Sequence, residues 1–321
     1  MDSTPDISIL VCTYNRAPEL RRTLTKLGEL EIPSGIRWDI LVVDNGSKDD
    51  TKDVVTSFKG RLPVRYALEP RPGKSYALNL GVSLCNAPMI MMTDDDVDVE
   101  SNWMLELHRA ALAHPETDFF GGKIVPRWEE PPPEWMARHS GDLLVGLTVN
   151  FTLGDEEAIL KAGGNTFLGA NSAYRKKTLT EMGGYREDLG PHGAVMGFHE
   201  ESEYIARLLA AGYTGLYLPQ MLVHHRNPPQ RTTQRYLLRW LVGCGKSDVL
   251  TGVIHPATPN LLGAPRYLWR QLILSAIHYA AGLMTRHTDR AWLKATFAMA
   301  KAWGAIQQFR ELNRKGNPQP G

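Results

Sequence analysis

Two hydrophobic periods alternate along residues 1–125. Short, continuous apolar runs predict buried strands over residues 7–12, 38–43, 64–68, 88–93 and 118–125. Between them, apolar residues recur every three or four positions and predict helices over residues 18–30, 49–58, 74–85 and 102–113. Strands that alternate with helices predict an α/β fold, in which helices flank both faces of a mostly parallel sheet. Such sheets bind ligands at the carboxyl ends of their strands.

The pattern becomes less regular after the run Pro131-Pro132-Pro133. The clear elements beyond it are a helix and then a strand, at residues 200–211 and 215–223. The C-terminal third has helical periodicity at residues 267–284 and 291–309. We therefore expect an α/β domain with a regular and a less regular half, followed by a helical extension, at residues 1–225 (1–125 and 126–225) and 226–321.

Two segments of the extension bear on membrane contact. Residues 267–284 are strongly apolar, but the stretch is shorter than an ordinary membrane span, and Arg270 and His278 make it more polar. We therefore expect it not to cross a membrane. Residues 291–309 are amphipathic, and their apolar side chains gather near one stripe at Trp292, Met299, Trp303 and Ile306. That stripe suits a membrane surface, and it equally suits packing on the protein's own body or on the partner in a homodimer.

Charge is distributed unevenly, although the formal net charge is only +1. From Arg226 onward, fourteen Lys and Arg residues stand against three acids, which gives +11 and leaves −10 for the preceding part. A basic C-terminal part predicts an anionic partner or surface. We expect peripheral membrane contact through the C-terminal helices, and no nucleic-acid partner.

The cysteines indicate a reducing compartment. Cys12, Cys85 and Cys244 are odd in number, widely spaced and without a metal-ligand or CxxC pattern. The chain opens without a basic segment followed by a long apolar one, which argues against a signal peptide. We expect a cytoplasmic protein that works at the cytoplasmic face of the membrane.

Three consecutive acids, Asp94, Asp95 and Asp96, follow the predicted strand at residues 88–93. Two carboxylates about 4 Å apart repel by roughly 4 kcal/mol at an effective dielectric constant near 20, so such a cluster needs solvent or a cation. Hard oxygen ligands favour Mg²⁺ or Mn²⁺, which keep coordination sites free for the phosphates of a substrate. A solvated acidic turn is the alternative.

Several motifs in this order resemble glycosyltransferase family 2, a family of inverting enzymes with the GT-A fold. The resemblance runs from residue 7 to about residue 245 and rests on the segments Val11-Cys12-Thr13-Tyr14-Asn15-Arg16, Val42-Val43-Asp44-Asn45-Gly46-Ser47, Gly73-Lys74-Ser75, Asp94-Asp95-Asp96, and Glu200-Glu201 with Arg207. It implies a Rossmann-like mixed sheet flanked by helices. Residues 1–125 would be the nucleotide-binding half of the catalytic domain and residues 126–225 its acceptor half.

The resemblance also implies a nucleotide site. Thr13, Tyr14 and Asn15 would border the base, with Arg16 beside the donor. Asp44 would accept a hydrogen bond from a uracil-like base, although an acid at this position is also typical of a helix start. Further residues of the donor site would be Lys74 near the diphosphate, Asp94 at the ribose, and Asp95. An exposed lysine at a helix start is the alternative for Lys74.

Metal ligands follow from the same resemblance. Asp96 and Asp94 would hold Mn²⁺ or Mg²⁺, and a late histidine often supplies a third ligand in this family. His225 fits that position better than His224, because it precedes Arg226-Asn227-Pro228-Pro229 as in the family pattern. A structural role for a histidine at a strand end is the alternative.

The catalytic base would come from Glu200-Glu201, where the family usually has Glu-Asp. By that pattern Glu201 takes the proton of the acceptor hydroxyl. Its side chain is one methylene longer than the usual aspartate, so Glu200 stays open as the base. Acids are also common at a helix start because they interact favourably with the helix dipole.

The sugar and acceptor sites are less sharply marked. The resemblance implies contacts from Gly164, Asn165, Asn171 and Arg231. Trp103, Trp128 and Trp135 can each stack on a saccharide or serve the core. The Gln-x-x-Arg-Trp motif of processive synthases is absent, since Tyr236 stands three residues before Arg239.

Together these features predict an inverting, metal-dependent transferase that moves one sugar. The donor is expected to be a nucleoside-diphosphate sugar, with a UDP-sugar favoured. The expected acceptor is a hydroxyl group of a lipid-linked or cell-surface glycan precursor, in polysaccharide biosynthesis. A sugar nucleotidyltransferase and a non-catalytic nucleotide- or glycan-binding protein are the alternatives.

Overall fold

The computed structural model describes residues 4–139, 143–164, 169–192, 196–256, 260–285 and 290–316. The chain forms two compact units. The first unit contains Met1–Glu129, Thr148–Glu187 and Glu200–Asn227, and the second contains Glu130–Leu147, Asp188–His199 and Pro228–Gly321. Because the segments interleave, the chain passes between the units several times before the C-terminal helices.

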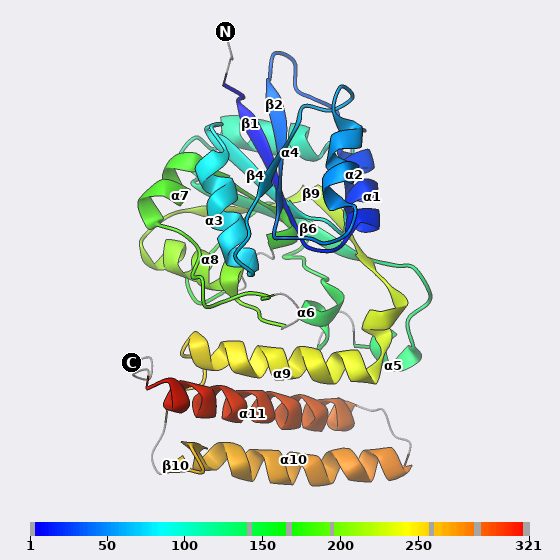
Figure 1. Ribbon diagram of the computed structural model, residues 1–321, viewed down its shortest axis with the longest axis vertical. Coiled ribbons are helices and arrows are strands. Elements are labelled where there is room, and N and C mark those ends of the chain that lie inside the picture. The colour runs from blue at the N-terminus through cyan, green and yellow to red at the C-terminus, as the bar shows by residue number, and fades with distance from the viewer. Residues whose placement is uncertain are drawn as a thin grey trace. The chain divides into compact units, whose positions relative to one another are not determined.

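The first unit begins with a parallel sheet whose strands are joined by helices. Its strands are β1 (Ile7–Thr13), β2 (Trp38–Asp44), β3 (Val64–Leu68) and β4 (Met89–Asp94), arranged in the order β3-β2-β1-β4. The connecting helices are α1 (Ala17–Leu27), α2 (Thr51–Phe58) and α3 (Lys74–Leu84). Figure 1 shows α1 and α2 on one side of these strands and α3 on the other. The change of side follows from right-handed crossovers, because the strand order reverses direction after β3.

Beyond β4 the sheet becomes mixed. Four shorter or later strands extend it: β5 (Val97–Val99), β6 (Phe119–Trp128), β8 (Ser172–Arg175) and β9 (Gly215–Asn227), with β7 (Ala158–Ile159) paired to β9. The remaining elements of this unit are α4 (Trp103–Ala113), a 3-10 turn η1 (Gly169–Asn171), α7 (Lys176–Met182) and α8 (Glu200–Ala210). Strand β8 runs antiparallel to both β4 and β6. The expected α/β fold with a mixed, helix-flanked sheet is confirmed.

Close backbone packing explains one irregularity of the sheet. The register between β6 and β9 shifts between Gly122 and Ile124. A Cβ atom at Gly122 would lie 1.8 Å from the carbonyl oxygen of Met221, so only glycine lets the two strands approach here. The shifted register continues to the end of β9, where His225 lies opposite Val97 of β5.

The second unit is helical. It contains α5 (Glu134–Ala137), most of α6 (Val145–Thr148), η2 (Pro229–Thr232), α9 (Gln234–Leu250), the short pair β10 (Asn260–Leu261) and β11 (Ala264–Pro265), α10 (Arg266–Thr285) and α11 (Arg290–Lys315). Figure 1 shows α11 between α9 and α10. Two glycines allow α9 and α11 to touch: a Cβ at Gly245 would lie 2.1 Å from the Lys301 carbonyl oxygen, and one at Gly304 would lie 2.0 Å from that of Val242.

The apolar stripe on residues 291–309, which suited a membrane surface and internal packing equally, is mostly covered within this unit. Trp292 and Ile306 of α11 are buried, and only Trp303 is exposed. The exposed apolar side chains are instead on α10, where Ile273, Ile277 and Met284 are 59%, 61% and 86% exposed. Of the helices that the structure describes, none is long and apolar enough to cross a membrane.

Candidate active site

The carboxyl ends of three neighbouring strands bring the expected polar residues to one edge of the sheet. Thr13 ends β1 and lies in register with Asp44 at the end of β2. On the other side of β1, Cys12 lies in register with Asp94, the last residue of β4. Each of these strands is a buried apolar run, and the first polar residue after the run lies at the same edge of the sheet in all three strands.

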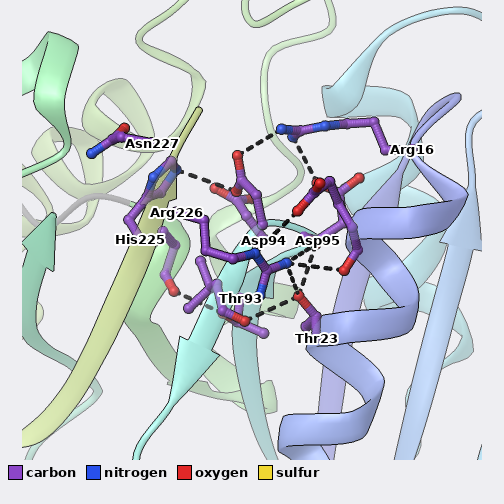
Figure 2. Close-up of polar contacts among 12 residues, drawn as sticks. Arg16, Thr23, Thr93, Asp94, Asp95, His225, Arg226 and Asn227 are labelled. Carbon is purple, nitrogen blue, oxygen red and sulfur yellow. Dashed lines mark hydrogen bonds and ion pairs between the residues drawn. The ribbon is translucent and has the colours of Figure 1, made fainter. Parts of the chain in front are cut away.

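Asp94, Asp96 and His225 form a cluster at this edge. Each offers one ligand atom, and these atoms all lie within 4.8 Å of one another. The Nε2 atom of His225 is 3.2 Å from Oδ1 of Asp96. Figure 2 shows the His225 ring on β9 directed at the carboxylates that follow β4. Two carboxylates and one imidazole fit a divalent cation, so these three residues could hold the expected metal ion.

The two adjacent histidines have different surroundings because successive side chains of a strand point to opposite faces. The Nε2 atom of His224 is 2.7 Å from Oε1 of Glu100, on the exposed side of β9. His225 is buried, and its Nδ1 atom has no hydrogen-bond partner among the described residues. Of the two, the structure therefore brings only His225 to the acidic cluster.

Arg16 lies across the acidic cluster from His225 (Figure 2). Its guanidinium group pairs with Oδ1 of Asp95 at 2.7 Å and with Oδ2 of Asp96 at 2.8 Å. The second oxygen of Asp95 accepts a 2.7 Å hydrogen bond from the Thr13 hydroxyl. Burial raises the pKa of Asp95 to about 7; Arg16 opposes this shift and Asp96 adds to it. Both Asp95 oxygens are thus engaged by the protein, which favours a structural role over the expected contact with the donor.

Arg226 is a buried cation under the acidic loop whose importance the sequence did not reveal. Its guanidinium group forms an ion pair with Asp98, and it donates to the carbonyl oxygens of Glu19 and Asp95, each at 2.9 Å. Its backbone N–H donates to the Asp96 carbonyl oxygen at 2.9 Å. Arg226 therefore fixes the backbone of the loop that carries the acids. The one signal in the sequence is its position next to the histidine.

Lys74, the first residue of α3, lies between the acidic cluster and the candidate base. Its Nζ atom is 2.9 Å from Oδ1 of Asp94, 2.7 Å from Oε1 of Glu201 and 3.6 Å from Oε1 of Glu200. Burial disfavours the ammonium form, but the carboxylates outweigh it, so the pKa of Lys74 lies well above its usual value. The lysine expected near the diphosphate is thus a permanent cation that joins two sets of acids.

The two candidate bases differ in their environment. Burial and, second, repulsion by Glu201 raise the pKa of Glu200 to about 8, against the opposing effect of Lys74. Glu200 therefore holds its proton to a higher pH than an ordinary glutamic acid does. Glu201 is partly exposed and packs on Gly169 of η1, where a Cβ atom would lie 2.0 Å from Oε1 of Glu201. The glycine thus gives the Glu201 carboxylate its space.

The loops after β1 and β2 hold each other in place. Asn15, with φ of 52°, accepts a 2.7 Å hydrogen bond from the Lys48 N–H through its side chain, and its own N–H donates to the Ser47 hydroxyl. The Asp44 carboxylate accepts hydrogen bonds from the Ser47 N–H and the Tyr66 hydroxyl, both at 2.8 Å. Tyr14 is 37% exposed beside them. Tyr66 was not expected here, because a tyrosine in a strand has no distinguishing pattern.

Some expected sugar-site residues lie elsewhere. Asn171 is fully buried, and its amide accepts from the Trp103 indole and donates to the carbonyl oxygens of Lys123 and Met221. Asn171, which we expected at the sugar site, and Trp103, for which a core role stayed open, thus contact each other in the core, and both are fully buried.

The remaining candidates are dispersed. Gly164 lies in an exposed turn, and Asn165 falls outside the described residues. Arg231 in η2 and Trp135 in α5 belong to the second unit, whereas half-buried Trp128 ends β6 in the first. Arg207, noted behind the acidic pair, donates to the carbonyl oxygens of Met182 and Gly184 and braces the chain after α7.

Comparison with known proteins decides the family. Residues 8–183 match the sequence model of the family described as Glycosyl transferase family 2. The chain belongs to glycosyltransferase family 2. It is therefore a glycosyltransferase that uses a nucleotide-sugar, and the edge of the sheet described above is its candidate active site.

Relatives of this glycosyltransferase match most of its length. The succinoglycan biosynthesis protein ExoM of Rhizobium meliloti is 24% identical over 252 residues, which are 74% of this chain and 72% of the relative. The glucosyl-dolichyl phosphate glucuronosyltransferase of Haloferax volcanii is 25% identical over 259 residues, 78% of each chain.

Solved structures share the fold of the glycosyltransferase. The mannosyltransferase PcManGT of Pyrobaculum calidifontis, solved with GDP-Man and Mn²⁺, has a TM-score of 0.63 at 17% identity and covers 97% of this chain and 88% of its own. TarS of S. aureus in complex with UDP-GlcNAc has a TM-score of 0.53 at 13% identity, with 97% and 92% covered. At these identities the likeness shows the GT-A fold alone.

Proposed function

We propose that the protein is an inverting glycosyltransferase that transfers one sugar from a nucleoside-diphosphate sugar to a hydroxyl group, with Mn²⁺ or Mg²⁺ as cofactor. The observation that carries the proposal is the continuity of the site. Asp94 belongs to the candidate metal cluster, and Lys74 connects it to Glu201 through contacts of 2.9 and 2.7 Å. Leaving-group stabilisation and proton removal, the two tasks of such a transfer, thus fall to neighbouring side chains.

Asp94, Asp96 and His225 would hold the metal ion. A bound divalent cation would neutralise the charge that develops on the diphosphate leaving group. Imidazole is a softer donor than carboxylate, so a set with one histidine favours Mn²⁺ over Mg²⁺, which prefers oxygen alone. PcManGT contains Mn²⁺, in keeping with this choice. Arg16 and Lys74 would keep the surrounding carboxylates neutralised and oriented toward this position.

Glu201 would be the general base. An inverting transfer needs a carboxylate that takes the proton of the acceptor hydroxyl as this oxygen attacks the anomeric carbon from the face opposite the leaving group. The raised pKa of Glu200 argues against that residue, because a carboxylic acid that keeps its proton cannot accept another. Glu200 would instead support α8 and the position of Glu201.

For the donor, we propose a UDP-sugar bound over the loops after β1 and β2. Thr13, Tyr14 and Asn15 would border the base. The Asp44 carboxylate already accepts two hydrogen bonds, and its remaining lone pairs can accept a third from the ring N–H of uracil. TarS with UDP-GlcNAc is a precedent for such a donor on this fold, whereas PcManGT binds GDP-Man.

For the acceptor, we propose a lipid-linked glycan precursor reached at a membrane surface. Helix α10 supports this with an exposed apolar side that includes Ile273, Ile277 and Met284. Its sequence contains Arg266 and Arg270 and no acid, which suits an anionic bilayer. The names of the relatives, which refer to succinoglycan biosynthesis and to a dolichyl phosphate, agree with a glycan-building role. Peripheral contact of this kind would place the enzyme at the cytoplasmic face of the membrane.

Calorimetric titration of UDP, GDP and dTDP tests the donor site, with Mn²⁺ and again with EDTA. We expect one nucleotide to bind only with Mn²⁺, and Asp96→Ala to abolish that binding. Asp155→Ala is the matched control, because this aspartate is exposed and, among the described residues, forms an ion pair with Lys123 alone. Equal binding with EDTA, or by the Asp96→Ala variant, would contradict the metal-dependent site.

A further inference from the structure

The residue that precedes α8, His199, has a backbone conformation that non-glycine residues rarely adopt. Its φ is +76°, in the left-handed region. Such a conformation is strained and persists only where the surroundings hold it in place. His199 is joined directly to Glu200 and lies two residues before Glu201, so whatever holds it also sets where the chain enters this helix.

The side chain of His199 is held by α9. Its Nε2 atom lies 3.0 Å from Oδ1 of Asp248, and the other oxygen of Asp248 lies 2.6 Å from Nζ of Lys301 on α11. Asp248 is buried. Burial alone would raise the pKa of Asp248, but the His199 and Lys301 contacts outweigh it and the pKa is lowered. The carboxylate is therefore ionised at neutral pH and binds both neighbours.

The residues just before His199 are held by the same helix. The Phe198 N–H donates a 3.0 Å hydrogen bond to the Ser247 hydroxyl, and the Phe198 ring lies 5.5 Å from the Trp240 ring, centroid to centroid. Gly243 provides the space: a Cβ atom there would lie 2.8 Å from the Met196 carbonyl oxygen and from the Phe198 ring. Four positions of α9 thus contact the segment 196–199.

We propose that this segment is a clamp, in which α9 holds residues 196–199 so that Glu201 is correctly placed. Asp248 and His199 are positioning residues for the base, and the helical unit contributes to turnover as well as to membrane contact. The proposal rests on the proposed function, because it takes Glu201 as the base. Close contacts of α9 with α11 at Gly245 and Gly304 give the clamp a rigid support. Misplacement of a catalytic group by about 1 Å can cost about 100-fold in rate.

A double-mutant cycle tests the clamp. The variants are His199→Ala, Asp248→Ala and the double variant, assayed for kcat, donor KM, Mn²⁺-dependent nucleotide affinity and melting temperature. We expect each single variant to lower kcat about 10- to 100-fold and to keep its nucleotide affinity within about twofold of wild type. The double variant should lose no more kcat than the more impaired of the two single variants. His199→Gln, whose amide can still donate to Asp248, should recover most of kcat.

Asn313→Ala is the matched control, because it removes a 2.9 Å hydrogen bond to the Gly263 carbonyl oxygen in the same unit, away from the clamp residues. It should leave kcat unchanged. Unchanged kcat in His199→Ala, or losses that add up in the double variant, would overturn the clamp. If Asp248→Ala does not fold, the comparison of His199→Ala with His199→Gln decides alone. Full activity of Glu201→Gln would instead refute the base itself, whatever the cycle shows.

Discussion

The ammonium group of Lys74 lies 2.7 Å from the carboxylate of Glu201, although the two residues are 127 positions apart in the chain. The same nitrogen lies 2.9 Å from Asp94 of the candidate metal cluster. One cation therefore links the two chemical halves of the site. Because Lys74 is the first residue of α3, the N-terminus of that helix sets the position of this link.

Removal of the Lys74 cation should damage turnover. In Lys74→Met, the carboxylates of Asp94 and Glu201 lose the cation that lies 2.9 and 2.7 Å from them. We expect kcat to fall roughly 10- to 100-fold, since a charged hydrogen bond is worth about 1.5–3 kcal/mol, and Lys74→Arg to retain part of it. Lys26→Met, which breaks only an exposed pair with Glu29, is the control and should behave as wild type. Unchanged kcat in Lys74→Met would remove the lysine from the site.

Glu200 should make stability depend on pH. Burial and repulsion by Glu201 raise its pKa from 4.5 to about 8 in the folded protein, so between these values the unfolded chain releases this proton first. Stability conferred by the protonated group is complete below about pH 4.5 and is lost as the pH rises to 8. The variant Glu200→Gln should not show this loss of stability, because glutamine has no proton to release in this pH range.

Urea unfolding at pH 5 and pH 8 measures that effect. We expect the free energy of unfolding of Glu200→Gln, relative to that of wild type, to be higher at pH 8 than at pH 5. Turnover of the variant should stay within about tenfold of wild type, because Glu200 is not the base. Glu203→Gln, in the same helix, serves as the control for the loss of a carboxylate. The interpretation fails if the difference between Glu200→Gln and wild type is the same at both pH values.

Contact with a membrane is expected to depend on α10. Flotation with phosphatidylcholine vesicles, with and without phosphatidylglycerol, should show binding only to the anionic vesicles. Ile273→Glu and Ile277→Glu should each lower that binding about tenfold or more, because insertion of one such side chain contributes about 1.5–3 kcal/mol. Leu112→Glu is the control, since Leu112 is 70% exposed on α4. No vesicle binding, together with a dimer that Ile277→Glu dissociates, would assign this side of α10 to a second copy of the chain.

Much of the fold was predictable from the sequence because its strands are buried apolar runs. Strand β3 matches its predicted bounds, and β1, β2 and β4 match within one residue at each end. The short strands β5 and β8 were missed, since three or four residues are too few to show a period. The helical stripe of α11 was visible, but a hydrophobic period does not tell what covers it.

The site was only partly predictable, because local sequence patterns indicate some of its residues but not the contacts between distant segments. Adjacent acids at a strand end indicated the metal cluster, and alternation along β9 separates His225 from His224 once the strand is known to reach Asn227. The roles of Arg226 and Gly169 depend on contacts between distant segments, which no local pattern encodes. Asn171 shows the converse, because a polar residue in a motif can serve the core.

The most direct test of the proposed chemistry is the turnover of Glu201→Gln with the nucleotide-sugar whose nucleotide binds. Release of the nucleoside diphosphate would be followed with a lipid-linked glycan fraction as acceptor, and Mn²⁺-dependent nucleotide affinity would be measured in parallel. We predict unchanged affinity and a kcat lower by roughly 10²- to 10⁴-fold, the range typical of a lost general base. Near-normal turnover in Glu201→Gln would contradict the assignment of the base and, with it, the proposed mechanism.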